Sequence, residues 1–149
     1  MNHNLKLVPL QEPHLNRVFD IEQKAHSHPW SKSLLFNLDS RGAFHHALLK
    51  DDRLIGYFYA QNIVGEVTLL NVAIDPNQQG SGCGKWLIEH FLELCMANGA
   101  ESVWLEVRES NHRAYGLYLD MGFNEVDRRV DYYPTANGKE DAIIMSYML

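Results

Sequence analysis

The stretch Leu69 to Lys85, LLNVAIDPNQQGSGCGK, decides the fold of this chain. An apolar run from Leu69 to Ile74 ends at Asp75-Pro76, a polar turn with glycines at alternate positions follows, and Trp86 opens an apolar pattern of helical period. This order predicts a strand, a glycine-rich loop and a helix. Glycine permits positive φ and close approach of a ligand, and the first turn of a helix leaves N–H groups unpaired. The stretch therefore predicts a site for an anion such as a phosphate group.

Residue spacing excludes two known phosphate-binding loops. A P-loop needs glycine five residues before its Gly-Lys pair and Ser or Thr after the lysine, where this chain has Gln79 and Trp86. A dinucleotide-binding loop needs a glycine three residues after its G-x-G, and neither Gly80-Ser81-Gly82 nor Gly82-Cys83-Gly84 is followed by one. The remaining spacing is Q-x-x-G-x-G, which begins at Gln79. An ordinary loop before a helix is the alternative interpretation.

Composition and charge restrict the class of protein. With 149 residues, 46% of them hydrophobic, and five scattered prolines, the chain is expected to form one domain over residues 1–149. No apolar run reaches the roughly 20 residues of a membrane span, and the N-terminus lacks the apolar region of a signal peptide. We therefore expect a cytoplasmic protein without a membrane partner. A net charge of −6 argues against nucleic acid as a partner, because that requires clustered basic surface.

Neither the cysteines nor the paired histidines form a recognisable metal pattern. Cys83 and Cys95 fit neither a disulfide framework nor the paired spacings of a structural metal site, so reduced thiols are expected. His26 and His28 lie two residues apart with no third ligand nearby in sequence. We therefore predict no metal site.

Apolar alternation and helical periodicity divide the rest of the chain into strands and helices. Ser31 and Asn111 are suited to be helix N-caps. The predicted strands cover residues 5–9, 43–50, 53–63, 67–74, 102–107, 124–131 and 142–148, the predicted helices cover 13–25, 32–38, 84–98 and 111–121, and a loop is predicted over 132–141.

Glu106 occupies an unusual position in the predicted strand 102–107, SVWLEV. Strict alternation places Val103 and Leu105 on one face and Trp104 and Glu106 on the other. A carboxylate at such a position is either a solvated outward residue or a base that faces a cleft. The strand pattern alone leaves both open.

Five further segments, together with the glycine motif and the order of the elements, carry a resemblance to a known family. They are Ala25-His26-x-x-Pro29-Trp30-Ser31, Leu69 to Pro76, Trp104-Leu105-Glu106-Val107-Arg108-x-Ser110-Asn111, Leu117-Tyr118-x-x-Met121-Gly122-Phe123-Asn124, and Tyr132-Tyr133-Pro134-Thr135 through Glu140-Asp141-Ala142-Ile143. The chain resembles the GCN5-related N-acetyltransferases (GNAT) over essentially its whole length. Within that family it is similar to the bacterial enzymes that acetylate the N-terminal alanine of a small-subunit ribosomal protein.

The resemblance implies a fold, a reaction and a set of site residues. The implied fold is α/β (α+β), the acyl-CoA N-acyltransferase fold, with a mixed, mostly antiparallel seven-stranded sheet flanked by about four helices. Glu106 corresponds to the proton acceptor and Tyr118 to the proton donor, and Asn111 to a contact of the pantetheine arm. The implied acetyl-CoA-binding residues are Val72, Ala73, Ile74, Gln79, Gly80, Ser81, Gly82, Cys83, Gly84 and Lys85. The chain departs from the family pattern at Ser81 and Cys83, where relatives carry a basic or a bulkier aliphatic residue.

The chemistry of direct amine attack agrees with an α-amine as acceptor. An α-amine with a pKa of about 7.7 to 8.0 is roughly a tenth neutral at pH 7, whereas a lysine near 10.4 costs about 3.5 kcal/mol more to deprotonate. Glu106 must have a raised pKa to act as a base, and we predict that burial beside Trp104 raises it. Tyr118 can donate a proton to the coenzyme thiolate only if its surroundings lower the phenol pKa. An acyl-cysteine on Cys83 is rejected, because no histidine lies near it in sequence.

The substrate follows mainly from the resemblance. We expect the N-terminal segment of a ribosomal protein and acetyl-CoA as partners, and a monomer or weak dimer. Two alternatives are an acetyltransferase for a small amine or another peptide, and a noncatalytic CoA-binding module. The candidates for contacts with a peptide terminus are Trp30, Tyr132, Tyr133, Glu140 and Asp141.

Overall fold

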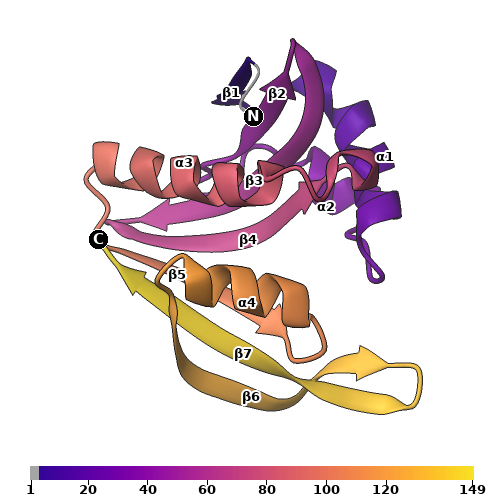
Figure 1. Cartoon of the computed structure of the whole chain (residues 1–149), viewed down its shortest axis with the longest axis vertical. Helices are drawn as coiled ribbons and strands as arrows, with labels where there is room; N and C mark the ends of the chain where they lie inside the picture. The colour runs from indigo at the N-terminus through magenta and orange to yellow at the C-terminus, as the bar shows by residue number, and fades with distance from the viewer. Residues whose placement is uncertain (1–3) are drawn as a thin grey trace.

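The computed structural model of this chain describes residues 4–149. It contains a twisted sheet with helices on both faces (Figure 1). Its strands are β1 (Leu5–Pro9), β2 (His46–Lys50), β3 (Arg53–Ile63), β4 (Glu66–Ile74), β5 (Ser102–Arg108), β6 (Asn124–Thr135) and β7 (Gly138–Met148). Its helices are α1 (Leu15–Ala25), α2 (Lys32–Phe36), α3 (Cys83–Ala97) and α4 (His112–Asp120), with short 3-10 turns at Glu12–His14 and Pro76–Gln78. The strand order is β1-β2-β3-β4-β5-β7-β6, and among these described strands only β4 and β5 pair in parallel.

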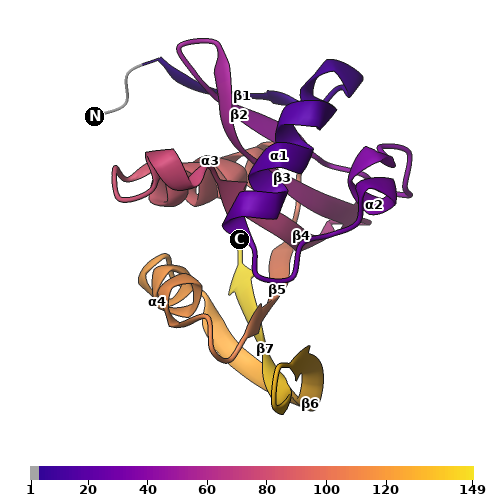
Figure 2. The same cartoon turned by 90° about the vertical axis from the view of Figure 1, so that its right-hand side faces the viewer.

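Two apolar layers cover the sheet. On one face, α3 buries Leu87, Ile88 and Phe91 in a cluster with Phe58 of β3. On the other face, α1 and α2 bury a second cluster that includes Val18, Ile21 and Leu35. Figures 1 and 2 show α3 and α4 on the first face and α1 and α2 on the second. The buried stripe predicted for the helix after the glycine loop is therefore core.

A β-bulge in β4 reverses the side-chain alternation of that strand. Tyr59 pairs with Asn71 and the next residue of β3 pairs with Leu69, so Leu70 is an extra residue in β4. Before the bulge, Leu69 faces the α3 layer; after it, Asn71 faces the α1 layer. A bulge re-aims the residues that follow it, and here it directs a polar side chain toward α1.

The parallel pairing of β4 and β5 is short. It joins Glu66–Leu69 to Ser102–Leu105 and then stops, and β4 continues beside β3 while β5 continues beside β7. Figure 1 shows the two strands diverging from their paired ends. This divergence opens the middle of the sheet on the side where α3 and α4 begin.

The predicted fold class is confirmed, and most predicted elements lie within a few residues of the observed ones. Ser31 accepts a hydrogen bond from Leu34 N–H, and Asn111 accepts one from Ala114 N–H, so both predicted caps are present. The predicted loop over 132–141 is wrong, because β6 and β7 continue as a hairpin to Thr135 and Gly138. A register shift in β6 and a positive φ of 52° at Asp131 interrupt the alternation that marks a strand in sequence.

Candidate active site

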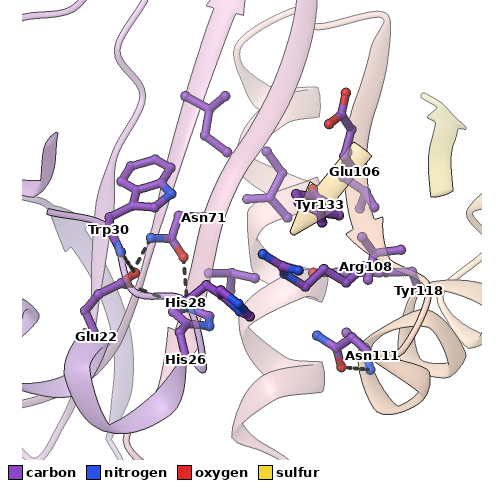
Figure 3. Close-up of a pocket in the computed structure, with 16 residues that line it drawn as sticks. Glu22, His26, His28, Trp30, Asn71, Glu106, Arg108, Asn111, Tyr118 and Tyr133 are labelled. Atoms are coloured by element: carbon purple, nitrogen blue, oxygen red, sulfur yellow. Dashed lines mark hydrogen bonds and ion pairs between the residues drawn. The ribbon is translucent and has the colours of Figure 1, made fainter. Parts of the chain in front are cut away.

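A cavity of about 250 Å³ lies where β4 and β5 diverge. Both strands contribute to its walls, with residues such as Val72 and Glu106, and the α1–α2 connection closes one side with His26, His28 and Trp30. Asn111 and Tyr118 come from the other side, on and next to α4. Figure 3 shows these side chains around a common space, drawn from segments far apart in the sequence.

The backbone of β4 presents unpaired polar groups to this opening. Asp75 N–H donates to Ile55 C=O at 2.7 Å, so this pair of the β3–β4 ladder is hydrogen-bonded. Because hydrogen-bonded and non-hydrogen-bonded pairs alternate, the pair Val72–Phe58 is not hydrogen-bonded. The N–H and C=O of Val72 therefore point away from β3, toward the gap left by β5. The Ala73 and Ile74 side chains are buried in opposite apolar layers, so only their backbones can serve a ligand.

The glycine loop has the geometry of an anion site. Gly80 and Gly82 have φ of +83° and +84°, and a Cβ built on either would meet no atom within 4 Å. Gly82 is the N-cap of α3, and among residues 4–149 the backbone amides from Gly80 to Lys85 donate to no protein acceptor. Unpaired amides at a helix N-terminus, reached over glycines, fit a pyrophosphate group.

Side chains in the loop turn away from this surface. Ser81 Oγ donates to Gln78 C=O at 2.7 Å, and Cys83 is buried with its Sγ 3.4 Å from Ser81 Oγ. Gln79 spans the loop, donating to Ile74 C=O at 3.3 Å and accepting from Arg113 Nη1 at 3.1 Å. The departures from the family pattern at Ser81 and Cys83 therefore leave the amide surface open.

Glu106 lies in a different environment from the predicted one. Its carboxylate accepts from Arg129 Nε at 2.9 Å, and its side chain is 31% exposed. Trp104 instead donates its indole N–H to Ser102 Oγ. The predicted burial of Glu106 beside Trp104 is therefore wrong, and a cation on β6 contacts the carboxylate instead.

Asn111, the N-cap of α4, and Tyr118, in its last turns, both line the α4 side of the cavity. Tyr118 is buried, and burial raises the pKa of its phenol well above the ordinary value of 10.0. A raised pKa makes the phenol a weaker proton donor, which is the opposite of what the predicted role requires. In this arrangement Tyr118 is better suited to donate a hydrogen bond than to transfer a proton.

A buried polar network on the α1 side was missed by the sequence analysis. Glu22 is completely buried and accepts hydrogen bonds from Trp30 N–H at 2.8 Å, Tyr57 Oη–H at 2.7 Å and Asn71 Nδ2–H at 2.9 Å. Asn71 in turn contacts His26 Nε2 through Oδ1 at 3.0 Å. A glutamate in an amphipathic helix is usually solvated. The available signal was its place between Ile21 and the His26 loop, on the apolar side of the helix.

The tip of the β6–β7 hairpin is fastened to β5. Arg108 pairs with Glu140 at 3.3 Å, and its guanidinium lies 4.2 Å from the ring centre of Tyr133. Glu140 also accepts from Ser110 N–H at 2.8 Å. Of the predicted peptide contacts, Trp30 and Tyr133 line the cavity, whereas Glu140 is engaged by Arg108.

The cysteines, the possible metal ligands and the lengths of the helices can be seen in the described part of the chain. Cys83 and Cys95 are both free and buried, and burial raises the pKa of Cys95 to about 12. Residues 4–149 contain no group of three His, Cys, Asp or Glu side chains arranged to hold a metal ion. Within the same range, no helix has the length and apolarity to cross a membrane.

A sequence profile of the acetyltransferase (GNAT) family matches residues 15–123, which include the glycine loop, Glu106 and Tyr118. The chain belongs to the GNAT acetyltransferase family. The family predicted from the sequence is therefore confirmed.

Several named relatives resemble this chain over most of their length. A Salmonella typhimurium protein named ribosomal protein bS18-alanine N-acetyltransferase is 42% identical over 132 residues, 89% of each chain. The Escherichia coli K12 protein of the same name is 38% identical over 137 residues, 92% of this chain and 93% of the relative. The crystal structure of the ribosomal-protein-S18-alanine N-acetyltransferase from Escherichia coli superposes with a TM-score of 0.91 at 36% identity, covering 97% of this chain and 93% of that one.

More distant GNAT structures share the fold. Arabidopsis thaliana NAA60, solved with a bisubstrate analogue, has a TM-score of 0.84 at 18% identity and covers 97% of this chain and 98% of its own. The predicted site residues divide into two places on this GNAT fold: Val72, Glu106, Asn111 and Tyr118 line the cavity, and Gln79 to Lys85 form the N-terminal side of α3.

Proposed function

We propose that this protein transfers the acetyl group of acetyl-CoA to the α-amine of an N-terminal alanine on a small-subunit ribosomal protein. The observation that carries the proposal is the gap between β4 and β5. It contains the cavity, and β4 leads from there through a short 3-10 turn to the amide surface at the start of α3. Relatives at 38 to 42% identity are named for this reaction. The donor and acceptor can then meet at the sheet centre in a ternary complex.

The donor is held by the chain's backbone. The amides from Gly80 to Lys85 bind the pyrophosphate, with Gln79 bracing the loop against Ile74 C=O. Val72 N–H, directed into the gap, hydrogen-bonds the thioester carbonyl and then the oxyanion, an interaction whose loss typically costs about 2.7 to 4 kcal/mol. Asn111, whose Oδ1 is used by the α4 cap, offers its Nδ2 to the pantetheine arm. Ala73 and Ile74 contribute backbone groups to the same edge.

The acceptor nitrogen attacks the thioester carbon from the side of Glu106. Attack forms the C–N bond, and the nitrogen then loses a proton, for which Glu106 is the proposed acceptor. Collapse breaks the C–S bond and releases the coenzyme thiolate, which Tyr118 stabilises with a hydrogen bond from its phenol. Glu106 and Tyr118 line the same cavity, which supports these roles.

The test combines acetyl-CoA with a synthetic peptide that begins with alanine and contains an internal lysine. We expect mass spectrometry to place the acetyl group on the α-amine, and a formyl-blocked copy of the peptide to remain unmodified. Acetylation of the lysine alone would contradict the substrate assignment. Turnover of a polyamine but of neither peptide would favour the small-amine alternative, and binding of acetyl-CoA without any turnover would favour a noncatalytic module.

A further inference from the structure

Three side chains from separate elements form a continuous hydrogen-bonded chain beside the cavity. Glu22 lies near the end of α1, Asn71 follows the bulge in β4, and His26 begins the α1–α2 connection. Asn71 Nδ2–H donates to Glu22 Oε1 at 2.9 Å, and Asn71 Oδ1 lies 3.0 Å from His26 Nε2. Figure 3 shows Glu22 on the left, with Asn71 and His26 between it and the side chains of Arg108 and Tyr118.

This arrangement determines which nitrogen of His26 carries hydrogen. A carboxylate accepts hydrogen bonds only, so Glu22 requires the NH₂ group of Asn71 and turns the amide oxygen toward His26. An amide oxygen also accepts only, so His26 Nε2 must carry the hydrogen. In the neutral ring the lone pair is then on Nδ1. The network therefore produces one tautomer of His26, with a basic nitrogen on the atom that Asn71 does not hold.

The negative charge of the buried Glu22 favours a cation at His26. Glu22 is completely buried, and its three hydrogen-bond donors are neutral. His26 Nε2 lies 3.7 Å from the Glu22 carboxylate. When the His26 ring is protonated, it is the cationic group within 4 Å of that carboxylate among the described residues. A buried carboxylate is costly unless a positive charge balances it. Proton uptake by His26 supplies such a charge.

The proposed reaction needs a second proton acceptor. An α-ammonium must lose one proton to become a nucleophile, and after attack the nitrogen loses another as the amide forms. Glu106 can take one of these, and the leaving thiolate takes up one proton from the site, so one proton is released overall. A free imidazole, with a pKa of about 6.5, is closer to an α-amine than a free carboxylate at about 4.3. The first transfer is therefore less unfavourable to an imidazole.

We infer that His26 accepts the first proton from the acceptor α-ammonium, with Asn71 and Glu22 as its positioning residues. The N–H bond of the ammonium breaks, an N–H bond forms at His26 Nδ1, and the resulting imidazolium is balanced by Glu22. This inference rests on the proposed function and adds a second proton acceptor to Glu106. The other charged or titratable side chains that line the cavity with His26 are Glu22, His28, Glu106, Arg108, Tyr118 and Tyr133.

The test is the pH dependence of kcat/KM for an alanine-terminated peptide with His26→Gln. Glutamine can still donate to Asn71 but has no basic nitrogen. We expect a loss on the order of 10²-fold near pH 6.5. The loss in kcat/KM should become smaller as the pH rises above the amine pKa of about 7.7 to 8.0, because the acceptor amine is then already neutral. The Kd of acetyl-CoA, measured by calorimetry, should not change.

His28→Gln is the matched control, because His28 lines the same cavity but its Nδ1 is engaged by Ser27 Oγ at 3.0 Å. We expect any loss in kcat/KM to be constant across pH, so that the pH profile keeps the shape of the unmodified protein's. Asn71→Ala should reproduce the pH-dependent loss, and the double variant with His26→Gln should lose no more than His26→Gln alone. A His26→Gln loss that stays constant from pH 6 to 9, an unchanged rate, or fully additive losses would overturn the inference.

The experiment distinguishes failure of the proposed function from failure of the inference about His26. If the unmodified protein does not acetylate the alanine peptide, the substrate assignment fails before any variant is compared. The series is then run with the amine that the protein does acetylate, and the His26→Gln profile retains its meaning. A narrowing loss at high pH supports His26 as proton acceptor for that amine, and a flat loss rejects it.

Discussion

Arg129 on β6 donates a hydrogen bond from Nε to Oε1 of Glu106 on β5 at 2.9 Å, across the intervening strand β7. The proposed proton acceptor is therefore paired with a cation in the free protein. Both side chains are partly solvated, at 53% and 31% exposed, so the ion pair can open when an acceptor enters. This pairing leads to two separate predictions about catalysis.

Glu106→Gln should lower kcat on the order of 10²-fold or more, because glutamine keeps the shape of the side chain but cannot accept a proton. Binding of acetyl-CoA should change little, since the glycine loop lies elsewhere on the fold. Steady-state kinetics and calorimetry measure the two quantities. Unchanged turnover would remove Glu106 as the base.

Arg129→Gln should raise kcat/KM for the alanine-terminated peptide, because the ion pair with Glu106 no longer has to open before the acceptor amine reaches the carboxylate. The rise should be no more than about fivefold, because an exposed ion pair contributes at most about 1 kcal/mol. Arg128→Gln is the control, since Arg128 is the adjacent arginine on β6 and pairs with Glu109 and Glu125. A rise of equal size in that control would contradict the pairing argument.

Gly82→Val should abolish measurable binding of acetyl-CoA. Its φ of +84° and the open space where a Cβ would stand mean that valine both strains the backbone and covers the amides. Gly99→Val separates these effects, because Gly99 has a similar φ of +74° and equally open surroundings, at the other end of α3. Both variants should lose roughly 1 to 2 kcal/mol of stability from the left-handed conformation. Calorimetry showing normal affinity in Gly82→Val would contradict the loop as the phosphate site.

Acid should loosen the β6–β7 hairpin tip. The Ser110 backbone N–H and then Arg108 hold the pKa of Glu140 below its ordinary value of 4.5. A lowered carboxyl pKa stabilises the fold above the ordinary pKa, and the stabilisation is lost as the pH falls through the lowered value. The protection factors of the amides at the tip, corrected for the intrinsic exchange rate at each pH, should therefore fall below about pH 4.5. Glu140→Gln should remove that dependence. Exchange that follows the same pH curve in both proteins would show that Glu140 is not the group involved.

Local patterns were sufficient to predict much of the fold. The alternation of Ser102 to Val107 and the cap at Asn111 depend on neighbours in sequence, and both are observed. The hairpin tip was missed because its strands are irregular near Asp131. The turn before Gly138, with Asn137-Gly138, was the available signal for a hairpin.

The site was less predictable because its chemistry depends on distant partners. The surroundings of Glu106 are determined by Arg129, which lies 23 residues away in sequence. Burial of Glu22 depends on Asn71, 49 residues away, and on a bulge that no local pattern marks. The glycine loop was readable because its function uses backbone amides and glycine conformations, which are local properties.

The extra residue in β4 has a consequence for protein engineering. If Leu70 were deleted, Asn71 would follow Leu69 directly, so the strand would regain regular alternation while Asn71 to Ile74 kept their layers and their pairing with β3. A deletion of Val72 has no such outcome, because Ala73 and Ile74 would then exchange layers. We therefore expect β4 to tolerate the loss of one residue at the bulge and not in the regular part of the strand.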